Sequence, residues 1–301
     1  MSFADLLGHE AAIRLLKAQL ERGVGPRTYL LVGPEGIGKR MLALEFSKAL
    51  QCEALDVFLL EPQGNLQIGI EEIRALEAKV SLTPFGGQWK AAIVTEADRL
   101  TEEATHACLK ILEEPPERTI FLLTAQALHR LPATLVSRCT VIRCAPQGVE
   151  RVWRHLQEKE GMASEEARRL AVCSGGRLGI ALRLHRTGGL VSKNEKLDQL
   201  LLALKKRTLE VPLGKAPREK VLEALEWYAA WWRDMLVLAL GGDPAWVIHQ
   251  DRLEELKRSK SSTQTLLSRI ERTYDLHAAV ERNVNLRTAL AVLLSDACPT
   301  T

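Results

Sequence analysis

A run of glycines followed by a lysine is the first part of the sequence that indicates chemistry. Gly33, Gly36 and Gly38 precede Lys39 in the segment GPEGIGK. This spacing lets backbone N–H groups surround the phosphates of a nucleotide while the lysine reaches the outer phosphates. An apolar run precedes the loop and a helical pattern follows it, the order that directs the amino terminus of a helix at phosphate. The segment therefore predicts a phosphate-binding loop.

The residue after this lysine departs from the pattern of an ATPase. A Ser or Thr hydroxyl that binds Mg²⁺ is expected there, and the chain has Arg40. Arginine has five hydrogen-bond donors and no acceptor, so it cannot bind the metal on which phosphoryl transfer depends. The alternative is a tolerated substitution in a site that still binds nucleotide. We favour a site that has lost catalysis.

The carboxylates that should complete the site are also altered. An ATPase has two at the end of a hydrophobic strand, one for the metal and one that orients the attacking water. The segment AAIVTEADRL has Glu96 at the second position, Thr95 at the metal-side position and Asp98 further along. The alternative is that Glu96 and Asp98 only begin the next helix, where acidic residues are favoured. Arg40 and Thr95 are therefore two predicted defects at the positions that should bind the metal.

Alternating strands and helices must position these residues. Apolar runs rich in β-branched residues alternate with helical patterns from residue 29 to about 145, which predicts a parallel sheet covered by helices. The segment HEAAIRLLKAQLERG predicts an amphipathic helix with Ile13, Leu16 and Leu20 on one face. After residue 150 the strand patterns stop, and the rest of the chain is predicted to be helical, beginning with two or three short helices up to about residue 187.

Composition limits the class of protein. The chain has 301 residues, of which 46% are hydrophobic and 26% charged, as in globular proteins of two or three domains. A net charge of +3 is too small to indicate a protein that coats nucleic acid. The six cysteines lack the spacing of a zinc site, so we expect no metal. The cysteine pattern, the amino terminus and the absence of a long apolar run together predict a cytoplasmic protein without a membrane segment.

Three motifs make this sequence similar to a known family. GPEGIGK, TEADRLTEEATHACLKILEEPP and LPATLVSRC occur in this order, and over about residues 3–185 the chain resembles the AAA+ subunits of DNA polymerase clamp loaders. LKILEEPP and SRC are the most specific of these pieces. The resemblance implies an α/β P-loop AAA+ core with a parallel five-stranded sheet at residues 1–146. It further implies a small helical lid at 147–189 and an all-α collar domain at 190–301.

The resemblance also implies roles for single residues. Arg138 in SRC matches the family's arginine finger, which reaches ATP held by a neighbouring subunit; the alternative is an arginine that caps carbonyls at a helix end. Active members carry a lid arginine that contacts the γ-phosphate, and Gly179 matches that position here. Arg177 would substitute for it only in another alignment. Many bacterial relatives insert a four-cysteine zinc module after the P-loop helix, and only Cys52 matches it, so no zinc is expected.

Arg40, Thr95 and Gly179 are therefore altered while Arg138 is intact, which implies a non-hydrolysing, stator-like subunit. We expect no ATPase activity of its own, weak or absent ATP binding and no required cofactor. The implied partners are motor ATPase subunits and a clamp-opening subunit in a hetero-pentameric ring, with the sliding clamp and primed DNA reached through that complex. The alternatives are an ATP-hydrolysing motor subunit of the same machine and an autonomous AAA+ remodelling ATPase.

A cluster of aromatic residues marks the helical carboxy-terminal part. Its members are Trp227, Tyr228, Trp231 and Trp232, in the segment LEWYAAWWRD. At this spacing they form one large stripe on a helix, which is more often part of a core than a ligand site. The alternative, an interface between chains, stays open. A last helix is predicted in NVNLRTALAVLLSDA, residues 283–297.

Overall fold

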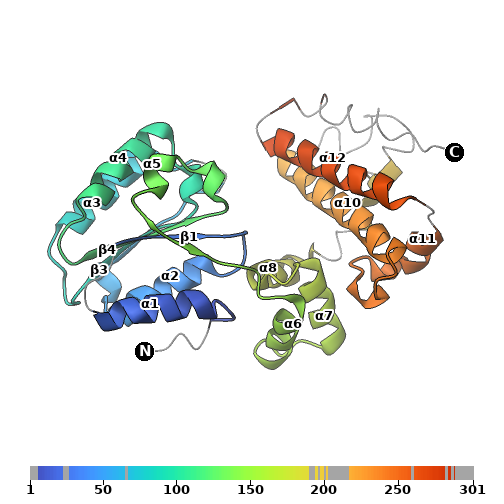
Figure 1. Ribbon diagram of the computed structural model, residues 1–301, viewed down its shortest axis with the longest axis horizontal. Coiled ribbons are helices and arrows are strands. Elements are labelled where there is room, and N and C mark those ends of the chain that lie inside the picture. Colours follow the sequence, from blue (N-terminus) through green and yellow to red (C-terminus); the bar gives the residue numbers. More distant parts are fainter. Residues whose placement is uncertain are drawn as a thin grey trace. The chain divides into compact units, whose positions relative to one another are not determined.

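A five-stranded parallel sheet forms the centre of the first part of the chain in the computed structural model (Figure 1). Its strands are β1 (Thr28–Val32), β2 (Val57–Leu60), β3 (Lys90–Val94), β4 (Thr119–Ala125) and β5 (Thr140–Arg143). They lie in the order β2-β3-β4-β1-β5, and all four neighbouring pairs are parallel. All residues of β1, β3 and β4 are buried, as expected for strands covered on both faces. The predicted parallel five-stranded sheet is confirmed.

The structure describes most of the chain. The described part comprises residues 6–22, 27–64, 67–189, 194–195, 197–199, 201–202, 217–258, 261–281, 284–285 and 288. The side chain of Leu20 and nearly all of the helix predicted at residues 283–297 lie outside it.

Helices cover both faces of the sheet (Figure 1). On one face lie α1 (Glu10–Arg22) and α2 (Lys39–Ala49); on the other lie α3 (Ile70–Ser81), α4 (Glu102–Glu113) and α5 (Ala133–Val136). Side chains along β1 alternate between the two faces, so Leu30 joins the core under α3 and α4 while Leu31 joins the core under α1 and α2. Leu16 of α1 is fully buried and Ile13 half-buried, as the amphipathic pattern predicted.

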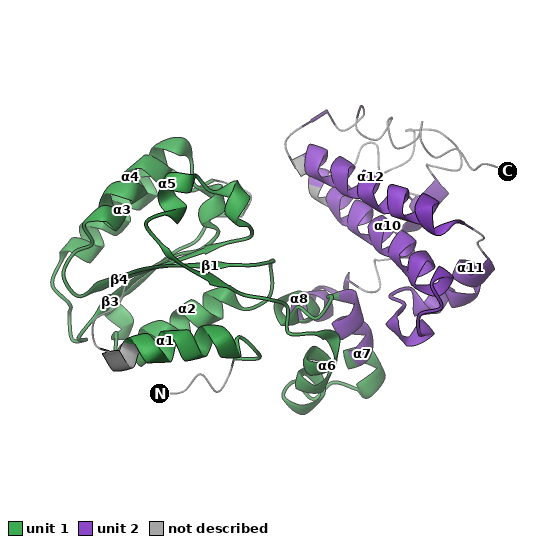
Figure 2. Cartoon of the chain, in the orientation of Figure 1, with its two compact units in different colours: residues 1–167, 174–181 green, residues 168–173, 182–301 purple. Residues whose placement is uncertain are grey.

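Three short helices follow the sheet, namely α6 (Val149–Glu158), α7 (Ser164–Cys173) and α8 (Leu178–Thr187), and they match the helices predicted there. By its internal contacts the chain divides into two units (Figure 2). One comprises residues 1–167 and 174–181, and the other comprises 168–173 and 182–301. The boundary passes through α7 and α8, and the predicted domains 1–146, 147–189 and 190–301 stay a prediction.

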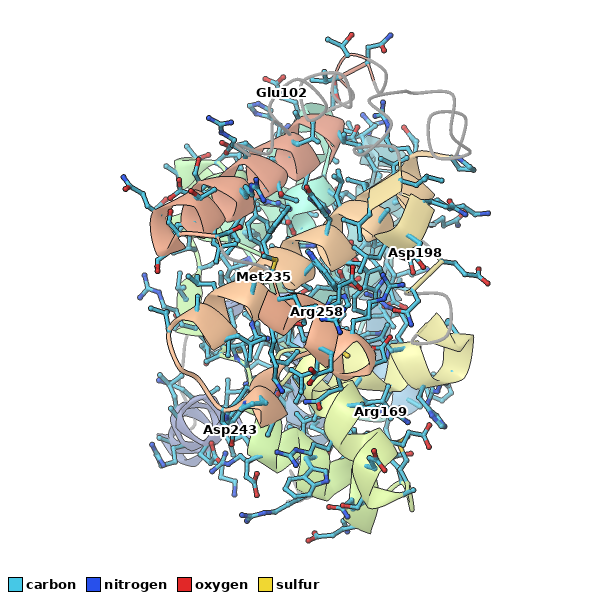
Figure 3. All side chains as sticks on the ribbon, turned by 90° about the vertical axis from the view of Figure 1, so that its right-hand side faces the viewer. Glu102, Arg169, Asp198, Met235, Asp243 and Arg258 are labelled. Atoms are coloured by element: carbon cyan, nitrogen blue, oxygen red, sulfur yellow. The ribbon has the colours of Figure 1, made fainter. Side chains whose placement is uncertain are left out.

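The second unit is built around two long helices, α10 (Arg218–Ala239) and α12 (Thr263–Glu281), joined through η5 (Pro244–Trp246), η6 (Gln250–Arg252) and α11 (Leu253–Arg258). The aromatic stripe lies on α10, within the two turns before Met235, which is labelled in Figure 3. Its four rings are at most 7% exposed within the chain, and most of them share a core with Leu266 and Leu276 of α12. The stripe is therefore part of a core, as predicted.

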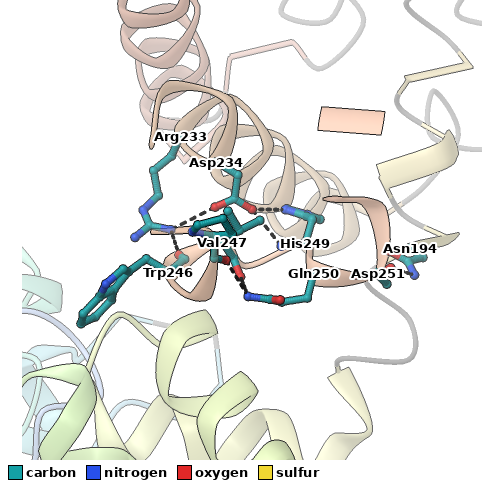
Figure 4. A network of polar contacts seen from close by, with 9 residues as sticks. Asn194, Arg233, Asp234, Trp246, Val247, His249, Gln250 and Asp251 are labelled. Carbon is teal, nitrogen blue, oxygen red and sulfur yellow. Dashed lines mark hydrogen bonds and ion pairs between the residues drawn. The ribbon is translucent and has the colours of Figure 1, made fainter. Parts of the chain in front are cut away.

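A buried polar network fixes η5 and η6 to α10 (Figure 4). The carboxylate of Asp234 accepts hydrogen bonds from the backbone N–H and the Nδ1 of His249, each 2.8 Å long. Arg233 donates to the same carboxylate and to the backbone oxygen of Trp246, at 3.0 Å each. The ring of His249 meets that of Trp231 edge to face, with 5.4 Å between the centroids. Because a buried carboxylate is costly without partners, these contacts make the segment depend on Asp234.

A second buried carboxylate fixes the loop before β3. Asp56 is 2% exposed and accepts backbone hydrogen bonds from Phe85, Gly86 and Gly87, at 2.7, 3.3 and 3.0 Å. Burial raises the pKa of Asp56, but the three N–H donors outweigh burial and the net pKa lies below the ordinary 3.8. The ionised form therefore stabilises the fold.

We expect the change Asp56→Ala to lower the free energy of unfolding by about 2 kcal/mol near neutral pH, because three buried N–H donors lose their acceptor. The folded pKa lies below the unfolded pKa, so the contribution of Asp56 is complete above the unfolded pKa and is lost as the pH falls through the folded pKa. Urea unfolding from about pH 7 down to about pH 3 measures this. Exposed Glu53→Ala is the control, and a stability difference that stays constant in acid would contradict the assignment.

Candidate functional site

The predicted phosphate loop connects β1 to α2, so the strand, loop and helix order is confirmed. Gly36 and Gly38 have φ values of 75° and 99°, in the left-handed region that favours glycine. Gly38 is the N-cap of α2 and provides no side-chain cap. The first N–H groups of α2 therefore have no capping side chain, which is the arrangement used to bind anions.

Lys39 is turned into its own loop. Its ammonium group donates to the backbone oxygens of Gly33 and Pro34, at 2.6 and 2.7 Å, and the residue is only 9% exposed. Burial lowers the pKa of Lys39, and nearby acidic groups, among them Asp98, oppose this shift. The ammonium group of Lys39 thus has two hydrogen-bond acceptors within the protein when no nucleotide is bound.

The beginning of α8 rests directly on the phosphate loop. The backbone N–H of Gly179 donates to the backbone oxygen of Gly36 at 2.7 Å. A Cβ atom added at Gly36 would lie 2.5 Å from Cγ1 of Ile180, and one added at Gly179 would lie 2.9 Å from the Gly36 oxygen. There is no room for a side chain at either glycine. The position matched to the lid arginine is therefore a backbone contact, while Arg177 donates through Nε to the oxygen of Ser174 at 2.7 Å.

Two residues that the sequence analysis missed also contact the loop. The Nε2 atom of His9 lies 2.6 Å from the backbone oxygen of Ile37, and the side-chain amide of Gln147 donates to that same oxygen. The backbone N–H of Gln147 donates to Gly176, at 3.1 Å, in the turn before α8. His9 and Gln147 are 28 and 110 residues from Ile37 in sequence, so no local pattern identifies them.

Arg40 is paired with a carboxylate at the end of β2. Its Nε and NH2 groups donate to the two oxygens of Glu61, at 2.6 and 3.2 Å, in a two-pronged ion pair. Both side chains are largely exposed. Glu61 follows the apolar run VFLL, and no sequence pattern links it to Arg40. The guanidinium group is thus held beside Glu61 by charge and geometry.

Thr95 and Glu96 follow β3 at the same edge of the sheet as the loop. Thr95 is buried, and its backbone N–H donates to Leu60 at 2.9 Å. Glu96 has a φ of 50°, its N–H donates to the hydroxyl of Thr124, and its carboxylate pairs with Arg99 at 3.1 Å. Glu96 is the N-cap of a short 3₁₀ turn and does not begin α4, which starts at Glu102.

Asp98 lies in that 3₁₀ turn and is the more deeply buried carboxylate. Its side chain is 4% exposed, and its Oδ2 lies 3.8 Å from a guanidinium nitrogen of Arg130. Its Oδ1 is buried without a hydrogen-bond partner among the described residues. Asp98 therefore contributes negative charge near Lys39. This charge raises the pKa of Lys39 and so opposes the effect of burial.

Arg138 lies two residues beyond α5, on the side of the sheet covered by α4. Its NH1 group donates to the backbone oxygen of Thr134 at 2.8 Å, and its NH2 group forms an ion pair with Glu113. It makes no hydrogen bond or ion pair with the phosphate loop in the part of the chain that the structure describes. The bond to Thr134 is of the kind expected for carbonyl capping, but the group also remains 33% exposed.

In the part of the chain that the structure describes, no cluster of three or more His, Cys, Asp or Glu side chains could hold a metal ion. Cys52 is half-buried, and its burial, aided by the charge of Asp56, raises the pKa of its thiol to about 12. No described helix has the length and apolar character needed to cross a membrane.

Comparison with known proteins gives a consistent set of relatives. Residues 53–148 match the family described as "DNA polymerase III, delta subunit". The delta' subunit of DNA polymerase III from Pseudomonas aeruginosa is 30% identical over 230 residues, covering 67% of this chain and 69% of the relative. The delta' subunit from Bacillus subtilis is 24% identical, covering 91% of this chain and 92% of the relative.

Two other similarities are narrower in what they show. The tau subunit of DNA polymerase III from Bacillus subtilis is 33% identical over 156 residues, covering 46% of this chain and 28% of the relative. The chain thus spans less than a third of that protein. The structure of the Thermotoga maritima RuvB branch migration motor aligns with a TM-score of 0.51 at 17% identity, over 98% of this chain and 85% of that one. This likeness shows the fold alone.

We expect the change Gly36→Ala to destabilise the protein more than Gly161→Ala. Both glycines have a positive φ, so each alanine costs about 1 kcal/mol of backbone strain. Nothing lies within 4 Å of a Cβ at Gly161, whereas one at Gly36 meets Ile180 at 2.5 Å, which adds about 1–3 kcal/mol. Thermal unfolding of the two variants measures the difference. Equal losses would mean that α8 does not rest on the loop.

Proposed function

The chain belongs to the family of DNA polymerase III delta' subunits, and we propose on this premise that it is a non-hydrolysing, stator-like subunit of the clamp loader. In this role it joins motor ATPase subunits and the clamp-opening delta subunit in a hetero-pentameric ring. The ring loads the sliding clamp onto primed DNA for the replicative polymerase, which places the chain in the cytoplasm. Its own contribution is Arg138, given as an arginine finger to a neighbouring ATPase.

The observation that carries the stator proposal is the closed phosphate loop. A triphosphate would have to compete with the two carbonyls that accept hydrogen bonds from Lys39, and the backbone of α8 at Gly179 already donates to the loop at Gly36. The lid position offers no cation to a γ-phosphate, because Gly179 has no side chain and no room for one. Polar groups of the loop are thus bonded to other protein groups. In a motor subunit, the loop must be available to the nucleotide.

The surroundings of the loop support the same proposal. Arg40 carries no metal ligand and is bound to Glu61, and Thr95 gives its N–H to the neighbouring strand. Glu96, matched to the carboxylate that orients water, is paired with Arg99. Phosphoryl transfer needs a metal and an oriented nucleophile at the same time. In the described structure, Arg40, Thr95 and Glu96 do not together supply this pair.

Arg138 has the properties required of a finger. It lies at the surface, and two of its five N–H donors are used among the residues that the structure describes, by Thr134 and Glu113. The other three can approach phosphate oxygens on a neighbouring subunit. A cation placed at such a site stabilises the charge that develops in the transition state.

A motor subunit of the same complex is the second candidate. The similarity to tau subunits and the intact loop with Lys39 favour it. It requires that α8 leave the loop when nucleotide binds and that Arg40 and Thr95 be tolerated. An autonomous remodelling ATPase has less support, because the likeness to the RuvB motor concerns the fold alone.

The two candidates differ in their affinity for nucleotide. We expect the isolated chain to bind Mg-ATP with a dissociation constant above about 1 mM, because binding must first open the contacts on the loop. Isothermal titration calorimetry measures this, with a motor subunit of the same complex as the positive control and Lys39→Ala as the matched variant. Micromolar binding that Lys39→Ala abolishes would favour the motor assignment.

The finger is tested in the reconstituted clamp loader with clamp and primed DNA. We expect Arg138→Ala to reduce stimulated ATP turnover by at least about tenfold, since a finger contributes about 10³–10⁵ at the site it serves. Lys39→Ala in this chain should leave turnover near normal, because that lysine serves no reacting nucleotide. If Lys39→Ala removes a share of the turnover in a ring that assembles to the normal extent, the chain hydrolyses ATP itself.

A further inference from the structure

Glu113 is the one side chain bonded to Arg138 in the described structure. It is the last residue of α4, in the motif LKILEEPP, and it lies 25 residues before Arg138 in sequence. Arg138 follows α5, so the ion pair ties the ends of two helices on the same face of the sheet. The neighbouring Glu114 is exposed and makes no ion pair with Arg138.

The contact leaves the guanidinium group oriented and still usable. NH1 donates to the oxygen of Thr134 and NH2 donates to one oxygen of Glu113, which fixes the plane of the group from two directions. The Nε–H and one hydrogen on each of NH1 and NH2 remain. An arginine held in this way can donate to a phosphate without first releasing either partner.

Fold stability does not explain the pair. The side chains of Arg138 and Glu113 are 33% and 50% exposed, and ion pairs of this kind contribute little to the free energy of unfolding. The pair instead orients the side chain. A finger that acts on another subunit must be in place when the site assembles. A long exposed side chain that is not already held in place loses rotational freedom at that step, which costs free energy.

We propose that Glu113 is a positioning residue, which together with the Thr134 carbonyl holds the Arg138 guanidinium in the orientation that it uses on the neighbouring subunit. This inference rests on the proposed function, because it assumes that Arg138 is a finger. It differs from that proposal in assigning a function to a carboxylate that touches neither nucleotide nor metal. The opposite effect would be competition, in which Glu113 withholds Arg138 from phosphate.

The two effects differ in sign, so the reconstituted clamp loader with clamp and primed DNA can separate them. We expect Glu113→Ala to lower the kcat for ATP by about tenfold or more, the loss typical of a misplaced catalytic group, with little change in KM because ATP is bound by the neighbour. Glu113→Gln keeps an oxygen acceptor for NH2 and should recover most of the activity. Glu114→Ala is the matched control and should be neutral.

A double-mutant cycle then shows whether Glu113 acts through Arg138. In the background of Arg138→Ala, the change Glu113→Ala should have no further effect on kcat. An equal loss in both backgrounds, a normal rate with Glu113→Ala alone, or a raised rate would each overturn the proposal. If Arg138→Ala itself has no effect, the proposed finger function fails, and this outcome is distinct from the failure of Glu113 alone.

Discussion

The backbone contact between Gly179 and Gly36 is the constraint on which the functional argument depends. A hydrogen bond of 2.7 Å joins α8 to the phosphate loop, and neither glycine has space for a Cβ atom. A side chain at Gly179 would require the loop or the start of α8 to shift, because its Cβ would lie 2.9 Å from the oxygen of Gly36. In the proposed stator, the missing lid arginine and the contact of α8 with the loop would have the same cause, because both involve Gly179.

Much of the fold could be predicted because its patterns are local. Continuous apolar runs identified the strands, since a strand buried on both faces has no polar side to interrupt it. The loop was predicted from glycines whose φ values of 75° and 99° few other residues adopt. The aromatic stripe of α10 was correctly assigned to a core because its spacing places the rings on one helix.

The partners of the site residues could not be predicted, because each contact joins distant parts of the chain. Glu61 is 21 residues from Arg40, and Gln147 is 110 residues from Ile37. An arginine in a sequence is expected to pair with a carboxylate, but its residue type does not indicate which of the 38 acidic residues is its partner. The buried carboxylate Asp56 has the same character, since its three donors lie 29 to 31 residues away. Polar contacts of this kind depend on the finished fold.

The presence of Lys39 is weaker evidence for ATP chemistry than its place in the motif indicates. A lysine that is 9% exposed needs acceptors wherever it lies, and the oxygens of Gly33 and Pro34 provide two. The lowered pKa of its ammonium group reflects burial, which would occur with or without a nucleotide. Replacing Lys39 would leave those carbonyls without their donor, so the loop has its own need for this side chain. The lysine can thus be explained by the structure of the loop, whereas the guanidinium of Arg138 lies partly exposed with three of its five donors unused in the described part of the chain.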